Sequence, residues 1–294
     1  MKKWFIATRP WSYTAASVPV LAGTAFAFWQ QETIHVWLFL LTLFGAILFQ
    51  TSTNLFNTYG DYKKGVDTIQ SATTCPQLVT GQMTPSSMYK AGLFALILTI
   101  LIGFYLVYTI GLWILFFGII GVLGAYCYTT GPSPYKFWGV GSIFVFFLMG
   151  PLMTAPSYYI QTTQLNANAF LIAAPISFLV SAILHVNDLR DINHDQNAGI
   201  QTLAIWLQLN RGIYHYVALC IGTVFSTILL VLFYIVPVTA LLPLILIPKI
   251  FNICKKLVKD TDSILVPLES ITAKLHFEYG ILWAIGIALG FFYK

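Results

Sequence analysis

Long apolar runs separated by short polar segments set the hydropathy pattern of this chain. A helix needs about 20 mostly apolar residues to cross the hydrocarbon core of a membrane, whereas barrel strands alternate in polarity over about 10 residues. The uninterrupted runs therefore predict helices and an all-α fold. The expected spans are 12–29, 36–56, 88–110, 112–128, 137–160, 169–186, 214–235, 238–253 and 273–292, which makes nine transmembrane helices.

Composition agrees with this polytopic arrangement. Of the 294 residues, 58% are hydrophobic and only 9% are charged, and the mean hydropathy is +0.79. A water-soluble domain could not carry that composition without a largely apolar surface. We therefore expect one integral membrane domain over residues 1–294.

Basic residues gather on one side of the expected spans. With nine spans, the lysines and arginines of the N-terminus and of the even-numbered connections share a side, and only Lys294 falls on the other. The positive-inside rule then places the N-terminus in the cytoplasm, and we expect a multi-pass protein of a bacterial plasma membrane. The net charge of +5 lacks the basic and aromatic pattern of a nucleic-acid binder, so membrane lipid or an anionic substrate is the expected partner.

A polar cluster closes the second apolar run, at residues 54–68. Asn57 and Asp61 are four residues apart, so they share one face if the helix continues through this stretch. Asp67 follows just beyond Gly65. Charged and amide side chains at the end of a membrane span indicate a functional site.

A second polar cluster closes the sixth run, at residues 187–195. Its Asn187, Asp191 and Asp195 also recur every four residues, which keeps them on one helical face. Asn57 and Asn187 are 130 residues apart, and each stands at the end of an even-numbered span. This offset predicts a four-helix pseudo-repeat that brings both clusters to one central cavity.

The side chains in the clusters are typical of a magnesium site. Carboxylates that face one another raise each other's pKa unless a cation neutralises them, and an oxygen-rich site without paired Cys or His suits Mg²⁺. Because Mg²⁺ completes its shell with phosphate oxygens, the pattern predicts a phosphorylated ligand. Lys63, Arg190 and Lys136 would add positive charge, although Lys136 also suits an ordinary membrane-interface position.

A diphosphate site that opens between apolar helices fits a polyprenyl diphosphate, whose head needs the metal and whose tail needs hydrocarbon. Tyr59 and Tyr128 could flank an allylic cation by cation–π attraction, or they could belong to the aromatic belt at the membrane surface. Arg9, followed by Pro10 and Trp11, has two interpretations as well, a membrane anchor or a substrate contact.

These motifs together resemble the UbiA superfamily of intramembrane aromatic prenyltransferases. The resemblance rests on Asn57-Thr-Tyr-Gly-Asp61 with Asp67, and on Asn187-Asp-Leu-Arg-Asp191 with Asp195. It covers essentially the whole chain, and the motifs look most like those of the branch that prenylates 1,4-dihydroxy-2-naphthoate in menaquinone synthesis, or of its vertebrate relatives that make menaquinone-4. It implies nine helices around a central cavity and Mg²⁺-dependent transfer of a polyprenyl group from its diphosphate to an aromatic acceptor.

The resemblance also implies the role of each residue. In this reaction the allylic diphosphate ionises, the electron-rich ring attacks the cation, and the naphthoate branch then loses the ring carboxylate. The residues that would bind the diphosphate through Mg²⁺ are Asn57, Asp61, Asp191 and Asp195, with Asp67 and Asn187 close by and with Arg190 and Lys136 in contact with the diphosphate.

Other functions remain open at this point. Within the enzyme class, the acceptor could be 4-hydroxybenzoate or a lipid alcohol. A cation-coupled transporter also uses repeats and intramembrane acids, but it should have broken helices near the midplane. Here the acids stand at helix ends, with Glu278 in the last span the exception, and the middles of the spans are expected to be unbroken apart from scattered Gly and Pro. The basic connection at residues 254–274 is expected to form a solvated face.

Overall fold

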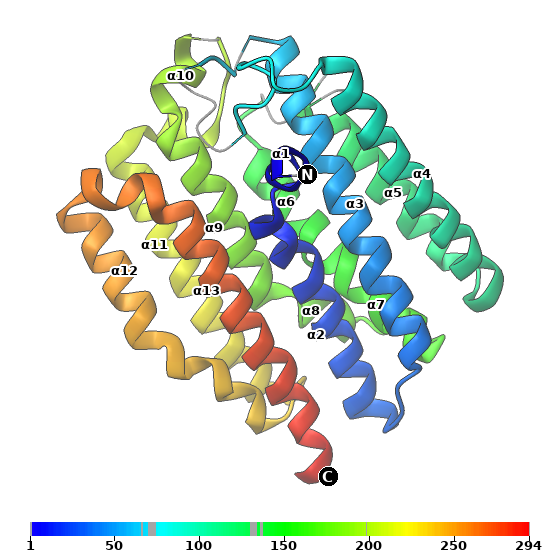
Figure 1. Ribbon diagram of the computed structural model, residues 1–294. Coiled ribbons are helices and arrows are strands. Elements are labelled where there is room, and N and C mark those ends of the chain that lie inside the picture. The colour runs from blue at the N-terminus through cyan, green and yellow to red at the C-terminus, as the bar shows by residue number, and fades with distance from the viewer. Residues whose placement is uncertain are drawn as a thin grey trace.

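The computed structural model describes residues 2–65, 67–69, 75–129, 134–135, 138–197 and 199–293, and within them it is an all-α bundle without a named β-strand (Figure 1). In the first half of the chain, the helices are α1 (Lys2–Ala7), η1 (Pro10–Tyr13), α2 (Thr14–Gln31), α3 (Val36–Lys63), α4 (Pro85–Ile110), α5 (Trp113–Thr129), α6 (Gly141–Met149) and α7 (Pro151–Thr162). The second half contains α8 (Asn168–Leu171), α9 (Ala174–Arg190), α10 (Ile192–Asn197), α11 (Leu203–Leu232), η3 (Val238–Leu246), α12 (Ile247–Lys259), α13 (Thr261–Leu289) and η4 (Gly290–Tyr293).

The helices have the length and surface of a membrane protein. In the described part of the chain, seven helices are long and apolar enough to cross a membrane, and the apolar α5 is shorter. Large apolar side chains such as Phe94, Phe104 and Phe225 are exposed on the bundle surface, as expected where lipid is the solvent. The prediction of an all-α integral membrane protein is therefore confirmed, whereas the count of nine spans stays a prediction.

One expected span is broken in the middle. The fifth apolar run forms two helices, α6 and α7, which meet at Gly150 and Pro151. Proline starts α7 because it lacks the N–H that a helix interior requires. Gly150 is needed because a Cβ there would lie 1.7 Å from Ser177 Oγ of α9. The break falls at a Gly–Pro pair, the kind of position at which the spans were not expected to be continuous, and close packing against α9 decides the backbone path there.

The core holds α2, α7, α9, α11 and α13 together. Trp283 of α13 is fully buried and donates from Nε1 to the carbonyl of Ile172 at 3.1 Å. One turn earlier in α13, the Tyr279 hydroxyl pairs with Thr227 of α11 at 2.6 Å. Such polar contacts satisfy groups that lipid cannot, and they fix α13 against α11 and against the segment that precedes α9.

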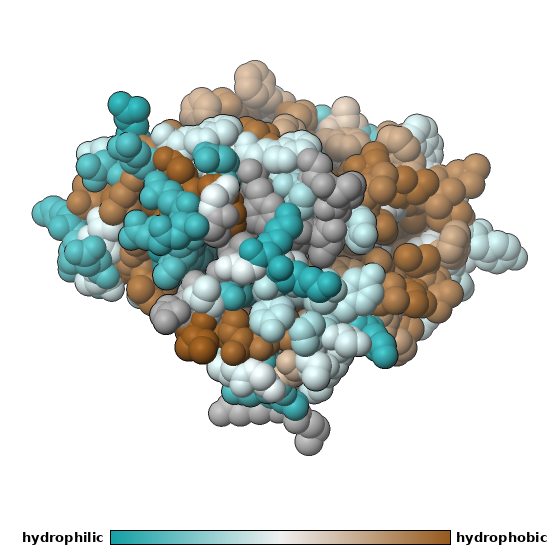
Figure 2. Space-filling view, turned by 90° about the horizontal axis from the view of Figure 1, so that it is seen from above, coloured by the Kyte–Doolittle hydropathy of each residue, from teal (hydrophilic) through white to brown (hydrophobic). Residues whose placement is uncertain are grey.

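Polar residues gather at one end of the bundle. The loop after α3 and the short α10 lie at this end (Figure 1), and a view onto it shows hydrophilic side chains over the left and centre and a mainly apolar surface on the right (Figure 2). The connection expected at 254–274 is helical, since α12 continues to Lys259 and α13 begins at Thr261. Its basic residues are exposed, as expected of a solvated face, whereas Glu269 is partly buried.

Candidate active site

The first acidic cluster lies at the end of α3. Asn57 and Asp61 stand one turn apart, and only 5% of Asp61 is exposed. The chain then turns through Gly65, whose φ of 71° lies in the left-handed region that glycine tolerates. The N–H of Asp67 donates to the carbonyl of Asp61 at 3.3 Å, so the three residues lie in one region.

Asn57 offers an open acceptor within this cluster. Its Oδ1 is buried and accepts no hydrogen bond from the described part of the chain. Leaving a buried polar atom unpaired costs about 1–3 kcal/mol. An orphaned oxygen beside a buried carboxylate is therefore a natural ligand position for a cation or a water molecule.

Arg9 reaches the first cluster from the segment before η1. Its Nη2 donates to Thr58 Oγ1 at 3.1 Å, and its Nε donates to Cys75 Sγ at 3.3 Å. Burial lowers the pKa of Arg9, but the interactions with Cys75, Glu269 and Asp61 outweigh burial and leave the pKa above its ordinary value. The charged guanidinium thus lies inside the cluster, which favours a substrate contact over a membrane anchor.

The second acidic cluster lies at the end of α9. Asp188 is 6% exposed and Asp195 is 7% exposed. Although α9 ends at Arg190, the N–H of Asp195 donates to the carbonyl of Asp191 at 2.9 Å, which is the helical i→i−4 bond. The four-residue spacing from Asn187 therefore continues into α10.

Arg190 is the centre of a hydrogen-bond network in this second cluster. Its Nε donates to Oδ1 of Asp191 at 2.9 Å and its Nη2 donates to Oδ2 at 2.7 Å. Nη2 also donates to Asn187 Oδ1 at 2.7 Å, and Nη1 donates to Glu269 Oε2 of α13 at 2.6 Å. The planar fork of arginine suits these paired bonds, so a cation of the chain itself holds the Asp191 carboxylate.

Tyr128 connects the two clusters. It is buried at the end of α5 and interacts electrostatically with Asp188 of α9, with Asp61 of α3 and with Arg9. Its ring lies 5.4 Å from that of Tyr135, centroid to centroid. The structure therefore brings the ends of α3, α5 and α9 into one buried polar site.

The structure does not bring Tyr59 and Lys63 together with these residues. The Tyr59 ring packs 5.1 Å from the ring of Tyr89 of α4, and Lys63 Nζ lies 5.6 Å from the Tyr59 ring. Both side chains therefore occupy the face of α3 that packs on α4. Lys136, a predicted diphosphate contact, lies outside the described residues.

Sequence reasoning missed two acids. Asp188 falls within the quoted motif, but it is off the four-residue spacing, and only its burial beside Tyr128 marks it as part of the site. Glu269 was assigned to a solvated connection, whereas it pairs with Arg190. No sequence signal joins Glu269 to a motif 79 residues away.

The residues present fit Mg²⁺ that is held jointly with a substrate. Among the described residues, no group of three or more His, Cys, Asp and Glu side chains could hold a metal ion. Mg²⁺ does not require such a cage, because it binds through one or two carboxylates and takes its remaining ligands from water and substrate phosphates. The buried acids and the open Asn57 Oδ1 supply hard oxygen donors of this kind.

The chain is similar to known prenyltransferases along most of its length. The profile of the UbiA prenyltransferase family matches residues 16–263. A 1,4-dihydroxy-2-naphthoate octaprenyltransferase of Bacillus subtilis (strain 168) is 32% identical over 97% of this chain and 92% of its own length. The protein with the same description from Escherichia coli (strain K12) is 30% identical over 97% and 95% of the two chains.

Solved structures share the fold. A UbiA homolog from Archaeoglobus fulgidus bound to GPP and Mg²⁺ superposes with a TM-score of 0.62 at 16% identity, over 96% of this chain and 99% of that one. A digeranylgeranylglyceryl phosphate synthase superposes with a TM-score of 0.61 at 17% identity, over the full length of both chains. The full-length relatives and the family profile together show that this chain is an integral membrane prenyltransferase of the UbiA prenyltransferase family.

Proposed function

We propose that this protein transfers a polyprenyl group from polyprenyl diphosphate to 1,4-dihydroxy-2-naphthoate, with release of diphosphate and loss of the ring carboxylate as CO₂, to give the hydroquinone form of demethylmenaquinone. The observation that carries the proposal is the convergence of Asp61, Asp188, Arg9 and Tyr128 at the ends of three helices. A diphosphate that binds together with Mg²⁺ matches a site in which buried acids and a buried arginine lie together.

Each group has a role in the proposed reaction. Asn57, Asp61, Asp67, Asp191 and Asp195 would hold Mg²⁺ with the diphosphate. When bound, this ion supplies positive charge that stabilises the departing diphosphate. Asn187 and Arg190 would contact the diphosphate once Arg190 gives up its two hydrogen bonds to Asp191 and donates to diphosphate oxygens instead.

Two further side chains, Arg9 and Tyr128, would contact the donor. Arg9 would bind a diphosphate oxygen, because its guanidinium is charged and already inside the cluster. Tyr128 would face the allylic cation and, being buried, would help to exclude water that could intercept it. Burial of the reacting carbon is essential, because water competes with the aromatic ring for the cation.

The proposed acceptor follows from the descriptions of the relatives. The proteins of Bacillus subtilis and Escherichia coli are both described as 1,4-dihydroxy-2-naphthoate octaprenyltransferases. We further propose that the end of the bundle that bears α10 faces the cytoplasm of a bacterial cell, where the basic residues of the even-numbered connections would lie.

An acceptor assay tests the proposal. Purified protein would be given radiolabelled four-unit prenyl diphosphate with Mg²⁺ or EDTA, and with 1,4-dihydroxy-2-naphthoate or 4-hydroxybenzoate. We expect a Mg²⁺-dependent prenylated naphthoquinol and release of CO₂. Asp61→Asn should lower the rate by about 10²-fold or more, whereas Asp260→Asn, which changes an exposed acid, should leave it unchanged.

The other outcomes are distinguishable. If product forms only with 4-hydroxybenzoate, that compound is the acceptor, and the proposed prenyl transfer itself stands. Release of diphosphate without a prenylated product of either acceptor would overturn both proposed acceptors. A rate that does not change with EDTA would overturn the role of Mg²⁺.

A further inference from the structure

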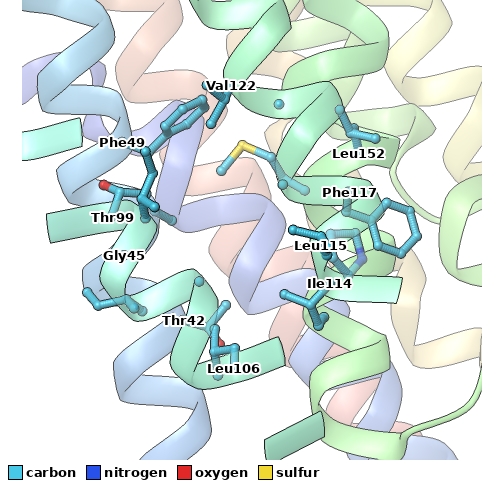
Figure 3. A pocket seen from close by; sticks show the side chains of 18 of the residues that line it. Thr42, Gly45, Phe49, Thr99, Leu106, Ile114, Leu115, Phe117, Val122 and Leu152 are labelled. Carbon is cyan, nitrogen blue, oxygen red and sulfur yellow. The ribbon is translucent and has the colours of Figure 1, made fainter. Parts of the chain in front are cut away.

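The two halves of α3 differ in what their side chains contact. Thr42, Gly45 and Phe49 of the first half line an apolar pocket of about 450 Å³ (Figure 3). From Gln50 on, α3 adds no residue to that lining. Several polar side chains of this second half instead form hydrogen bonds with the segment around η1. The last of them, Thr58, reaches the acidic site.

Arg9 has an unfavourable backbone conformation just before η1. Its φ of 49° and ψ of 62° lie in the left-handed region, where the Cβ of an L-amino acid comes too close to a carbonyl oxygen. Residues other than glycine persist in this region only when the surrounding structure holds them there, and they gather at functional sites. Neighbouring groups must therefore hold the backbone of Arg9.

Asn54 of α3 holds the backbone on both sides of Arg9. Its Nδ2 donates to the carbonyl of Thr8 at 2.8 Å and to Ser12 Oγ at 2.8 Å. The Ser12 hydroxyl in turn donates to the carbonyl of Arg9 at 2.8 Å, and the N–H of Ser12 donates to the same carbonyl at 2.9 Å. One amide group thus fixes the residue before Arg9 and the turn after it.

The guanidinium of Arg9 binds α3 one helical turn beyond Asn54. Asn54 and Thr58 are four residues apart, so they share a face of the helix, and Thr58 Oγ1 accepts from Arg9 Nη2 at 3.1 Å. The Thr58 hydroxyl itself donates to the carbonyl of Asn54 at 3.1 Å, which leaves its lone pairs for the guanidinium. The backbone of Arg9 is therefore held at Asn54, and its charge lies near Asp61 at the end of α3.

The contacts of Asn54 differ from those of Asn57, the other asparagine near this helix end. Oδ1 of Asn57 is buried and accepts no hydrogen bond from the described part of the chain, which suits a ligand. Asn54 is also buried, but its Oδ1 accepts from Gln50 Nε2 at 3.1 Å and its Nδ2 makes the bonds to Thr8 and Ser12. Both N–H groups of the Asn54 amide are used within the protein, so none is left for a substrate.

We propose that Asn54 is a positioning residue for Arg9 and raises the affinity for the donor without touching it. The inference rests on the proposed function, in which Arg9 binds a diphosphate oxygen. With Asn54 in place the strained turn is formed before the donor arrives, so the guanidinium needs no rearrangement on binding. Without Asn54, the backbone of Arg9 would relax to an ordinary conformation and the guanidinium would leave Thr58.

A double-mutant cycle on donor binding tests the inference. Equilibrium binding of the four-unit prenyl diphosphate with Mg²⁺ would be measured without acceptor. We expect Asn54→Ala to weaken binding about tenfold in the wild-type background and less than about twofold in Arg9→Ala, where the guanidinium that Asn54 positions is absent. In turnover assays with 1,4-dihydroxy-2-naphthoate, KM for the donor should rise about tenfold in Asn54→Ala, while kcat stays within about threefold.

Thr51→Ala is the matched control. Thr51 lies on α3 three residues before Asn54, and its hydroxyl pairs with that of Tyr13 at the other end of η1 at 2.9 Å. It therefore ties the same two elements together without contacting the backbone at Arg9. We expect Thr51→Ala to bind the donor within about twofold of wild type, even where it lowers the unfolding temperature as much as Asn54→Ala does.

Substitutions at Ser12 test the same contact from the other side. Ser12→Ala removes the hydroxyl that joins Asn54 to the carbonyl of Arg9, so we expect donor binding to weaken about threefold. Ser12→Thr keeps the hydroxyl and should bind the donor as wild type does. If Asn54→Ala does not fold, this pair decides the question, and equal affinity of the two Ser12 variants would contradict the proposal.

Other outcomes would also overturn the inference. An equal loss of affinity in Asn54→Ala with and without Arg9, or an equal loss in Thr51→Ala, would reduce Asn54 to a packing contact between α3 and η1. A loss that depends on Arg9, without any prenylated naphthoquinol, would keep the positioning role and overturn the proposed reaction. Wild type that binds no prenyl diphosphate would overturn both.

Discussion

Glu269 of α13 accepts a hydrogen bond from Arg190 Nη1 of α9 at 2.6 Å. Arg190 in turn holds both carboxylate oxygens of Asp191. The last long helix of the chain therefore supports the second acidic motif, although it contributes no motif of its own. Glu269 sets where Arg190 lies, and through Arg190 it sets where the Asp191 carboxylate points.

Glu269→Gln should weaken donor binding more than it weakens folding. The amide cannot balance the charge of Arg190, so the guanidinium would bind Asp191 more tightly and would leave it less readily for the diphosphate. We expect KM for the prenyl diphosphate to rise by about tenfold, the equivalent of about 1.4 kcal/mol. Steady-state kinetics would measure this rise, and Asp262→Asn, an exposed acid of the same helix, is the matched control. An unchanged KM would contradict the supporting role of Glu269.

Arg9→Lys should show whether the guanidinium fork matters or only its charge. Arg9 binds Thr58 Oγ1 and Cys75 Sγ through two different nitrogens, and lysine cannot reproduce both bonds. We expect donor affinity to fall about tenfold, which is the size of one charge-assisted hydrogen bond, with a smaller change in kcat. Lys3→Arg, an exposed basic residue of α1, serves as the control in titrations with prenyl diphosphate. Wild-type affinity in Arg9→Lys would leave charge alone as the requirement.

Asp188→Asn should impair the reaction, although Asp188 is outside the four-residue spacing of the motif. The side chain is buried and interacts with Tyr128, so the substitution removes negative charge where an allylic cation would form. We expect kcat/KM to fall by about 10²-fold while the protein stays folded. Asn193→Asp, at an exposed position of α10, should have little effect on kcat/KM. A result in which both variants match wild type would remove Asp188 from the site.

Gly150→Ala should destabilise the bundle, because the new Cβ would lie 1.7 Å from Ser177 Oγ and 2.8 Å from Ser177 Cβ. Overpacking of this kind costs about 1–3 kcal/mol, which thermal unfolding in detergent would detect. Adding Ser177→Gly should recover part of the loss, since it removes both atoms. Gly103→Ala, whose Cβ would meet nothing within 4 Å, should unfold at the wild-type temperature or slightly above. Equal unfolding temperatures for Gly150→Ala and Gly103→Ala would contradict the close approach of α7 to α9.

Much of the architecture follows from the sequence because hydrocarbon length and helix rise impose one scale on every span. The apolar runs of 36–56 and 88–110 fall within α3 and α4. The pairs Asn57 with Asp61 and Asn187 with Asp191 could be placed at helix ends for the same reason. Spacing along one helix is a local property, so it survives into the structure.

Tertiary packing decided the rest. The break at Gly150 depends on Ser177 of a different helix, and the selection of Asp188 over Tyr59 as a neighbour of Tyr128 depends on how α3, α5 and α9 converge. The contact of Glu269 with Arg190 spans 79 residues. The sequence by itself determined which residues carry charge and which helix ends they occupy, because those depend on hydropathy and on a period of 3.6 residues. Which of those charges meet was decided only by the tertiary structure, because distances between helices depend on side-chain packing that no local period encodes.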